Sequence, residues 1–195
     1  RFEVDLNRPR EKAVYLEPQD AWGLRVWNEP LPTAMVERSL ALYDGFYEAV
    51  ESVLQELVDQ HRRVVVYDLH TYNHRRLGPY ADPDEPQLNP LVNLGTRTMD
   101  RLVWAPVVEQ FLEDLRRFPF PDWTSDAREN IKFFGGHFGR RIHQRFPGSV
   151  CVLSIECKKV FMNEWNGDLD QAKLDTIRRA LHSTVAGVRE VLDRW

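Results

Sequence analysis

The chain has 195 residues, of which 43% are hydrophobic and 29% are charged, a balance typical of a soluble globular domain with one sizeable core. Its formal net charge of −4 argues against a nucleic-acid-binding protein, because contacts to phosphates normally require a basic surplus. No apolar run approaches the roughly 20 residues of a membrane-spanning helix and no signal-like leader opens the chain, so we expect a cytoplasmic protein without a membrane partner.

The first residues form a dense polar motif, RFEVDLNRPR, with no methionine or strand before it. We therefore expect a single domain over residues 1–195 that lacks an N-terminal segment. Residues 11–32 are rich in proline and aromatic residues, which indicates a loop. From Thr33 to Leu57 apolar residues recur at alternating spacings of four and three. This pattern predicts a long amphipathic helix with Thr33 as its N-cap.

The segment VVVYDLHTYNHRR, residues 64–76, begins as a strand and ends as a polar cluster. Its β-branched run predicts a strand over residues 64–69 that is buried on both faces. Asp68 and His70 would share one face, where the carboxylate can orient the imidazole as a partner behind a metal ligand. A helical continuation would pair His70 with His74, but the Asn, Arg and Gly residues that follow favour a loop. We therefore take His70 alone as the candidate ligand. A structural histidine bonded to a backbone carbonyl is the alternative.

The rest of the chain alternates strands and helices. The pattern predicts a loop over residues 78–90, a helix over 98–117, a strand over 131–134, a glycine turn, a strand over 150–156 and a helix over 170–194. Strands separated by helices of this length indicate an α/β domain with a sheet between helical layers. In open α/β sheets ligands bind beyond the carboxyl ends of the strands, so polar residues at strand ends are the candidate site.

Glu156 ends the apolar strand over residues 150–156 and shares a face with Ser154. Burying a carboxylate without compensation costs several kcal/mol. Glu156 is therefore either functional or paired with Lys158, Lys159 or an arginine, and the spacing leaves both interpretations open.

The two cysteines are six positions apart on that strand. They would lie about 20 Å from each other, beyond the reach of a disulfide. We predict that Cys151 and Cys157 are core residues. A reactive thiol is the weaker alternative, because its base would have to come from elsewhere in the fold.

Four motifs, in this order, resemble the N-formylglutamate amidohydrolase family. They are VDLNRPR (4–10), YDLHTYN (67–73), FFGGHFGRR (133–141) and LSIECKKVFMNEW (153–165), and together they span nearly the whole chain. The family is similar to aspartoacylase and, more distantly, to the zinc carboxypeptidases. The resemblance implies a three-layer α/β/α sandwich with a mixed sheet.

The resemblance also implies catalytic roles. His70 matches the position of the third zinc ligand, and Glu156 matches the general base. Arg1 matches an arginine that polarises the scissile carbonyl. The family's other two zinc ligands precede the DLNR motif, so we expect the 195 residues alone to bind zinc weakly or not at all.

Substrate-binding residues follow from the same resemblance. Asn7 and Arg8 match a pair that grips a substrate carboxylate, while Gly135, Gly136 and His137 match a wall of the substrate pocket. The implied activity is zinc-dependent hydrolysis of an N-acyl amino acid such as N-formyl-L-glutamate.

Two other functions are alternatives to this one. The first is a catalytically inactive binding or regulatory domain with the same fold. The second is a nucleic-acid surface formed by the basic runs at residues 61–63, 74–76 and 139–145, which the acidic total disfavours.

Overall fold

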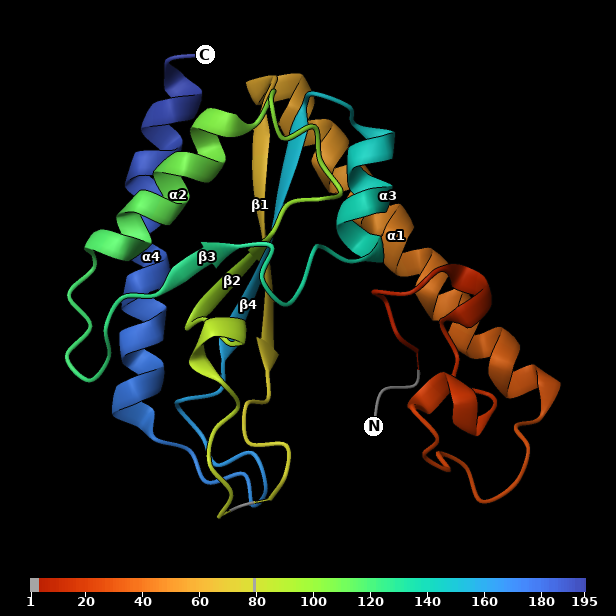
Figure 1. Cartoon of the computed structure of the whole chain (residues 1–195). Helices are drawn as coiled ribbons and strands as arrows, with labels where there is room; N and C mark the ends of the chain where they lie inside the picture. Colours follow the sequence, from red (N-terminus) through yellow and green to blue (C-terminus); the bar gives the residue numbers. More distant parts are fainter. Residues whose placement is uncertain (1–3, 79) are drawn as a thin grey trace. The chain divides into compact units, whose positions relative to one another are not determined.

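The computed structural model describes residues 4–78 and 80–195 (Figure 1). Contacts divide the chain into two compact units, each with its own hydrophobic core. Unit 1 comprises Arg1–Val64 and Gly136–Val150, and unit 2 comprises Val65–Gly135 and Cys151–Trp195. The single domain over residues 1–195 stays a prediction. No helix in the described part of the chain is both long and apolar enough to cross a membrane.

Unit 1 is built on the long helix α1 (Thr33–His61), with the short 3-10 helices η1 (Arg10–Lys12) and η2 (Pro18–Ala21) before it. The predicted apolar face of α1 is confirmed, since it buries Tyr43 and Tyr47. The prediction of Thr33 as N-cap is wrong. Pro32 occupies the N-cap position without a side-chain bond, and Thr33 is already helical.

Helix α3 (His137–Arg145) also belongs to unit 1, and the sequence pattern did not predict it. It is only nine residues long and buries a single large apolar side chain, Ile142, so it offers little periodicity to detect. Arg141 of α3 pairs with Glu51 of α1 at 2.8 Å.

Unit 2 contains a four-stranded sheet in the order β1-β4-β2-β3. The strands are β1 (Val64–Tyr72), β2 (Val92–Gly95), β3 (Ala127–Glu129) and β4 (Val150–Lys158). Strand β2 runs parallel to β3 and antiparallel to β4. Backbone bonds from Val64 N to Ser149 O and from Lys159 N to Tyr72 O join β1 and β4 start to start and end to end, so these strands run parallel. The predicted α/β class and mixed sheet are confirmed, whereas the three-layer sandwich stays a prediction.

Helices α2 (Ala105–Arg117) and α4 (Gln171–Asp193) lie side by side and pack on one face of this sheet (Figure 1). Leu153 and Ile155 of β4 and Leu94 of β2 point into this core and are fully buried. Tyr67 of β1 reaches the same side, where its hydroxyl lies 2.8 Å from Thr184 Oγ1 on α4. Because side chains alternate along a strand, the intervening residues of β1, β2 and β4 face the other way.

Several predicted boundaries in unit 2 are wrong. The short strand is β3 at Ala127–Glu129 rather than 131–134, and β2 was not predicted because four residues carry too little pattern. Helix α2 begins at Ala105 rather than residue 98. Asp100 Oδ1 accepts the N–H groups of Leu102 and Val103, which forms a turn just before the helix.

Strand β1 also differs from its prediction, because it extends to Tyr72 and is not buried on both faces. It is the terminal strand of the sheet, which leaves Leu69 59% exposed. The predictions for the loop, the two cysteines and the last helix agree with the structure. Among the described residues of the loop over 78–90, the short η3 (Pro86–Leu88) is the only regular element. Cys151 and Cys157 are free and buried, and the last helix is α4 with Asp170 as N-cap.

Candidate active site

A polar cluster lies on the face of the sheet opposite α2 and α4. Ser154 Oγ lies 3.5 Å from Asp68 Oδ2, which places the polar face of β4 beside that of β1. Glu156 pairs in register with Asn93 of β2, and directly opposed residues of paired strands point to the same face. The sheet therefore gathers Asp68, His70, Ser154, Glu156 and Asn93 on one face. Alternation predicted a shared face within each strand, for Asp68 with His70 and for Ser154 with Glu156.

The predicted pair of Asp68 and His70 is formed. His70 Nε2 lies 2.8 Å from Asp68 Oδ1, and the two side chains are 32% and 14% exposed. A carboxylate on one ring nitrogen fixes the orientation of an imidazole and raises its basicity as a ligand. His74 lies beyond the end of β1, outside any helix, so the structure supports a loop rather than a paired HTYNH helix.

Glu156 has the chemistry of a base that works near neutral pH. Burial raises the pKa of its carboxyl to about 7 from its ordinary 4.5, with the charge of Asp68 adding to the rise and that of His70 opposing it. The charges that act on Glu156 are thus members of the polar cluster. At neutral pH the group exchanges a proton with little cost in either direction.

Asn93 supports this cluster and was missed from the sequence. It is fully buried, and its Oδ1 accepts the backbone N–H groups of Ile131 and Lys132 at 3.0 and 2.8 Å. Its Nδ2 donates to Phe133 O at 2.8 Å. The segment predicted as a strand is therefore a bend wrapped around one amide side chain.

Gly135 follows this bend and packs tightly against β2. A Cβ at Gly95 would lie 2.4 Å from the Gly135 N, so only glycine permits this approach. Gly135 itself has φ of 107°, a conformation that favours glycine. The structure thus gives Gly135 a backbone role in unit 2.

In unit 1, Asp5 organises the opening motif. Its carboxylate accepts bonds from Tyr15 Oη at 2.6 Å and from the Asn7 N–H at 2.9 Å. The Arg8 guanidinium lies 3.5 Å from the same carboxylate and 4.4 Å from the Tyr15 ring centre. Tyr43 Oη also donates to the Arg8 carbonyl at 2.9 Å, which ties the motif to α1. The half-buried Arg8 guanidinium is therefore fixed in place by Asp5 and Tyr15.

Asn7 has a structural contact that its position in the sequence does not reveal. Its Oδ1 accepts the N–H of Phe138 at 3.0 Å and so caps the first turn of α3. A Cβ at Gly136 would lie 2.2 Å from the same oxygen, so the glycine makes room for Asn7. His137 Nε2 lies 3.1 Å from Tyr43 Oη, and burial lowers the His137 pKa, with Arg141 contributing to the shift.

The predicted site residues thus fall into two groups. Asp68, His70 and Glu156 share the polar face of unit 2, where Gly135 supports the neighbouring bend. In unit 1, Asn7, Gly136 and His137 gather at the start of α3, and Arg8 lies in the opening motif beside Asp5. Arg1 lies outside the described residues.

The described side chains fit part of the metal site that the family resemblance implies. His70, with Asp68 behind it, has the arrangement of one metal-ligating histidine. A catalytic zinc normally has three protein ligands. Among residues 4–78 and 80–195, no three His, Cys, Asp or Glu side chains form a group that could hold a metal ion. The described residues therefore fit one ligand of a zinc site and do not complete it.

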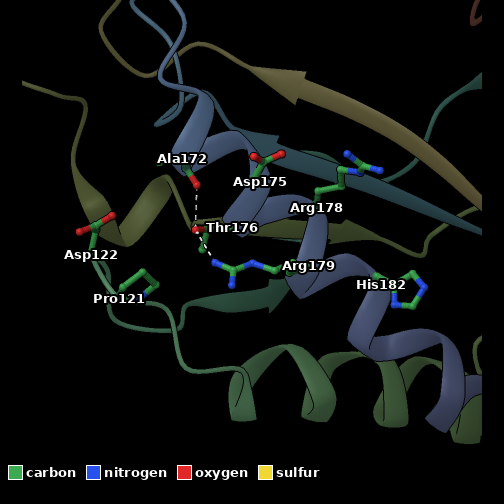
Figure 2. Close-up of a pocket in the computed structure, with 8 residues that line it drawn as sticks. All are labelled: Pro121, Asp122, Ala172, Asp175, Thr176, Arg178, Arg179 and His182. Carbon is green, nitrogen blue, oxygen red and sulfur yellow. Dashed lines mark hydrogen bonds between the residues drawn. The ribbon is translucent and has the colours of Figure 1, made fainter.

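A pocket of about 790 Å³ lies elsewhere in unit 2, beside α4 (Figure 2). Pro121 and Asp122 line one side of it, and α4 residues that include Arg179 and His182 line the other. Figure 2 shows Arg179 turned toward Thr176, whose Oγ1 accepts its bond at 3.3 Å. None of the predicted site residues is among the residues that line this pocket.

The fold and the polar face define a class of protein, an α/β protein whose sheet presents a half-buried carboxylate beside an oriented histidine. The family model for N-formylglutamate amidohydrolase matches residues 1–162, and the chain belongs to this family. Comparisons with curated proteins and with solved structures gave no match. Family membership confirms the resemblance seen in the four motifs and implies an amidohydrolase; the family is generally metal-dependent.

Proposed function

We propose that the protein hydrolyses the amide bond of a small N-acyl amino acid, with N-formyl-L-glutamate as the first substrate to test. The observation that carries the proposal is Glu156, a half-buried carboxylate with a pKa of about 7 on the same face as the His70 and Asp68 pair. General bases are most effective when their pKa lies near the working pH. Family membership supports the reaction class.

In the proposed reaction Glu156 accepts a proton from water as the water oxygen bonds to the amide carbonyl carbon. The carbon–nitrogen bond then breaks, and Glu156 returns the proton to the leaving amine. One water is consumed. A carboxylic acid and a free amino acid are released, and the acid is formate when the acyl group is formyl.

We also propose that zinc takes part, with His70 as one ligand and Asp68 holding its ring. When bound, zinc would lower the pKa of a water from 15.7 to about 7 and stabilise negative charge on the carbonyl oxygen. The described residues do not supply the two further ligands. Arg1 is proposed to polarise the same carbonyl.

The substrate-binding residues are proposed from the family resemblance. Arg8 supplies a positive charge, and Asn7 an amide group whose Nδ2 can donate while Oδ1 caps α3. Such paired, charge-assisted bonds suit a carboxylate. Gly135, Gly136 and His137 are proposed as a wall of the substrate pocket.

The direct test is release of formate from N-formyl-L-glutamate by the purified protein, with and without added zinc. N-acetyl-L-glutamate and an N-formyl amino acid with an apolar side chain would separate acyl from side-chain preference. We expect release in proportion to protein concentration. A protein that binds stoichiometric zinc yet releases acid from none of these compounds would instead be a binding domain with the same fold.

A further inference from the structure

A buried carboxylate that the proposed reaction does not use lies on the turn that follows β4. The side chain of Glu164 is only 1% exposed. Its Oε1 accepts the backbone N–H of His74 at 2.6 Å, and its Oε2 accepts that of Arg75 at 3.1 Å. His74 Nδ1 also lies 2.6 Å from Oε1. Glu164 thus joins the turn after β4 to the residues that follow β1.

The turn that carries Glu164 is itself well braced. Asn163 N donates to Asp168 O at 2.8 Å, and Asn163 Oδ1 accepts the Trp165 N–H at 2.9 Å. Trp165 Nε1 donates to Arg75 O at 2.8 Å, which makes a second tie to the segment after β1. Two adjacent side chains of one rigid turn therefore hold both polar groups of the Arg75 backbone.

The burial of the Glu164 carboxylate has a free-energy cost. Removing a carboxylate from water costs several kcal/mol, which is offset only by good hydrogen bonds. The hydrogen bonds of Glu164 go to backbone N–H groups just beyond β1, the strand that carries His70. The turn that contains Glu164 follows β4, the strand that carries Glu156. The position of the His70 side chain relative to that of Glu156 therefore depends on how the ends of β1 and β4 are joined.

We propose that Glu164 is a positioning residue, which holds the His70 end of β1 in place beside the Glu156 end of β4. It acts through the backbone of His74 and Arg75 and does not touch the reacting atoms. The proposal deepens the proposed function and rests on it wherever turnover is the readout.

The test compares Glu164→Gln with the control Glu129→Gln. Glu129 is also a paired carboxylate of unit 2, bonded to Arg101 at 2.9 Å, but it lies on β3. Both proteins would be assayed on N-formyl-L-glutamate. Their ring-labelled histidines would be recorded by ¹H–¹³C NMR at one pH, with His70→Asn to assign the His70 signal. In Glu164→Gln we expect kcat to fall about 10- to 100-fold with KM close to the wild-type value, and the His70 signal to move. The control should change neither.

An unchanged kcat and an unchanged His70 signal in folded Glu164→Gln would overturn the proposal. If that variant does not fold, Trp165→Phe decides, because it removes the N–H that donates to Arg75 O while keeping an aromatic ring, at a residue that is 52% exposed. The same two readouts should then change by less, and no change would again overturn the proposal. If wild-type protein releases no formate, the proposed function fails, while the His70 signal still tests the role of Glu164.

Discussion

Replacement of Glu156 by glutamine should stabilise the protein at alkaline pH. Because burial raises its pKa to about 7, the folded protein holds the Glu156 proton more tightly than the unfolded chain does. Stability is therefore lost as pH rises from 4.5 to about 7. At about 1.4 kcal/mol per pH unit this interval corresponds to about 3 kcal/mol, which partial solvent screening reduces to about 2 kcal/mol. Glutamine has no charge to bury and should avoid the loss.

Urea unfolding of wild type and Glu156→Gln at pH 5 and pH 8 measures this effect. The free energy of unfolding of the variant, relative to wild type, should rise by about 2 kcal/mol between the two pH values. Glu129→Gln is a control whose effect should not depend on pH over this interval. Burial raises the Glu129 pKa, but hydrogen bonds from Arg101 and Thr96 lower it overall from 4.5, so its stabilising effect is present at both pH values and this variant should lose about the same stability at pH 5 and at pH 8. A Glu156→Gln difference that is equal at both pH values would refute the reasoning.

Three further predictions follow from the described contacts. The kcat/KM for N-formyl-L-glutamate should fall about tenfold per pH unit below pH 7, where Glu156 becomes protonated, and a profile flat to pH 5 would contradict this. Gly95→Ala should cost about 1 to 3 kcal/mol in urea unfolding, because its Cβ would lie 2.4 Å from the Gly135 N, whereas Gly45→Ala in open space on α1 should gain about 0.5 to 1 kcal/mol. Asn7→Ala should lose about 1 kcal/mol with the cap of α3, whereas Asn7→Asp should keep that stability and raise KM; equal stability of the two would exclude the cap.

The part of the site that rests on local pattern could be predicted from the sequence. Alternation along β4 placed Glu156 with Ser154, and a spacing of two placed His70 with Asp68, because strand geometry fixes these faces without reference to the rest of the fold. The long helices α1 and α4 were predictable for the same reason, since each repeats its apolar face over several turns.

The features that the sequence did not predict depend on contacts between residues that are far apart in the chain. Asn93 converts a predicted strand into a bend by bonding backbone groups about 40 positions away, and no local pattern reports such a bond. Asn7 caps a helix that begins 130 residues later along the chain. The exposure of Leu69 likewise follows from the place of β1 in the strand order, which its own apolar run does not encode.

The proposal on which the others depend is that Glu156 is the base in hydrolysis of an N-acyl amino acid. It is tested most directly by the turnover of N-formyl-L-glutamate by Glu156→Gln, measured together with substrate affinity by calorimetry. We expect turnover to be abolished while the substrate binds about as tightly as to wild type, because the amide keeps the shape of the carboxyl but cannot accept the proton. Turnover at the wild-type rate by the folded variant would contradict it.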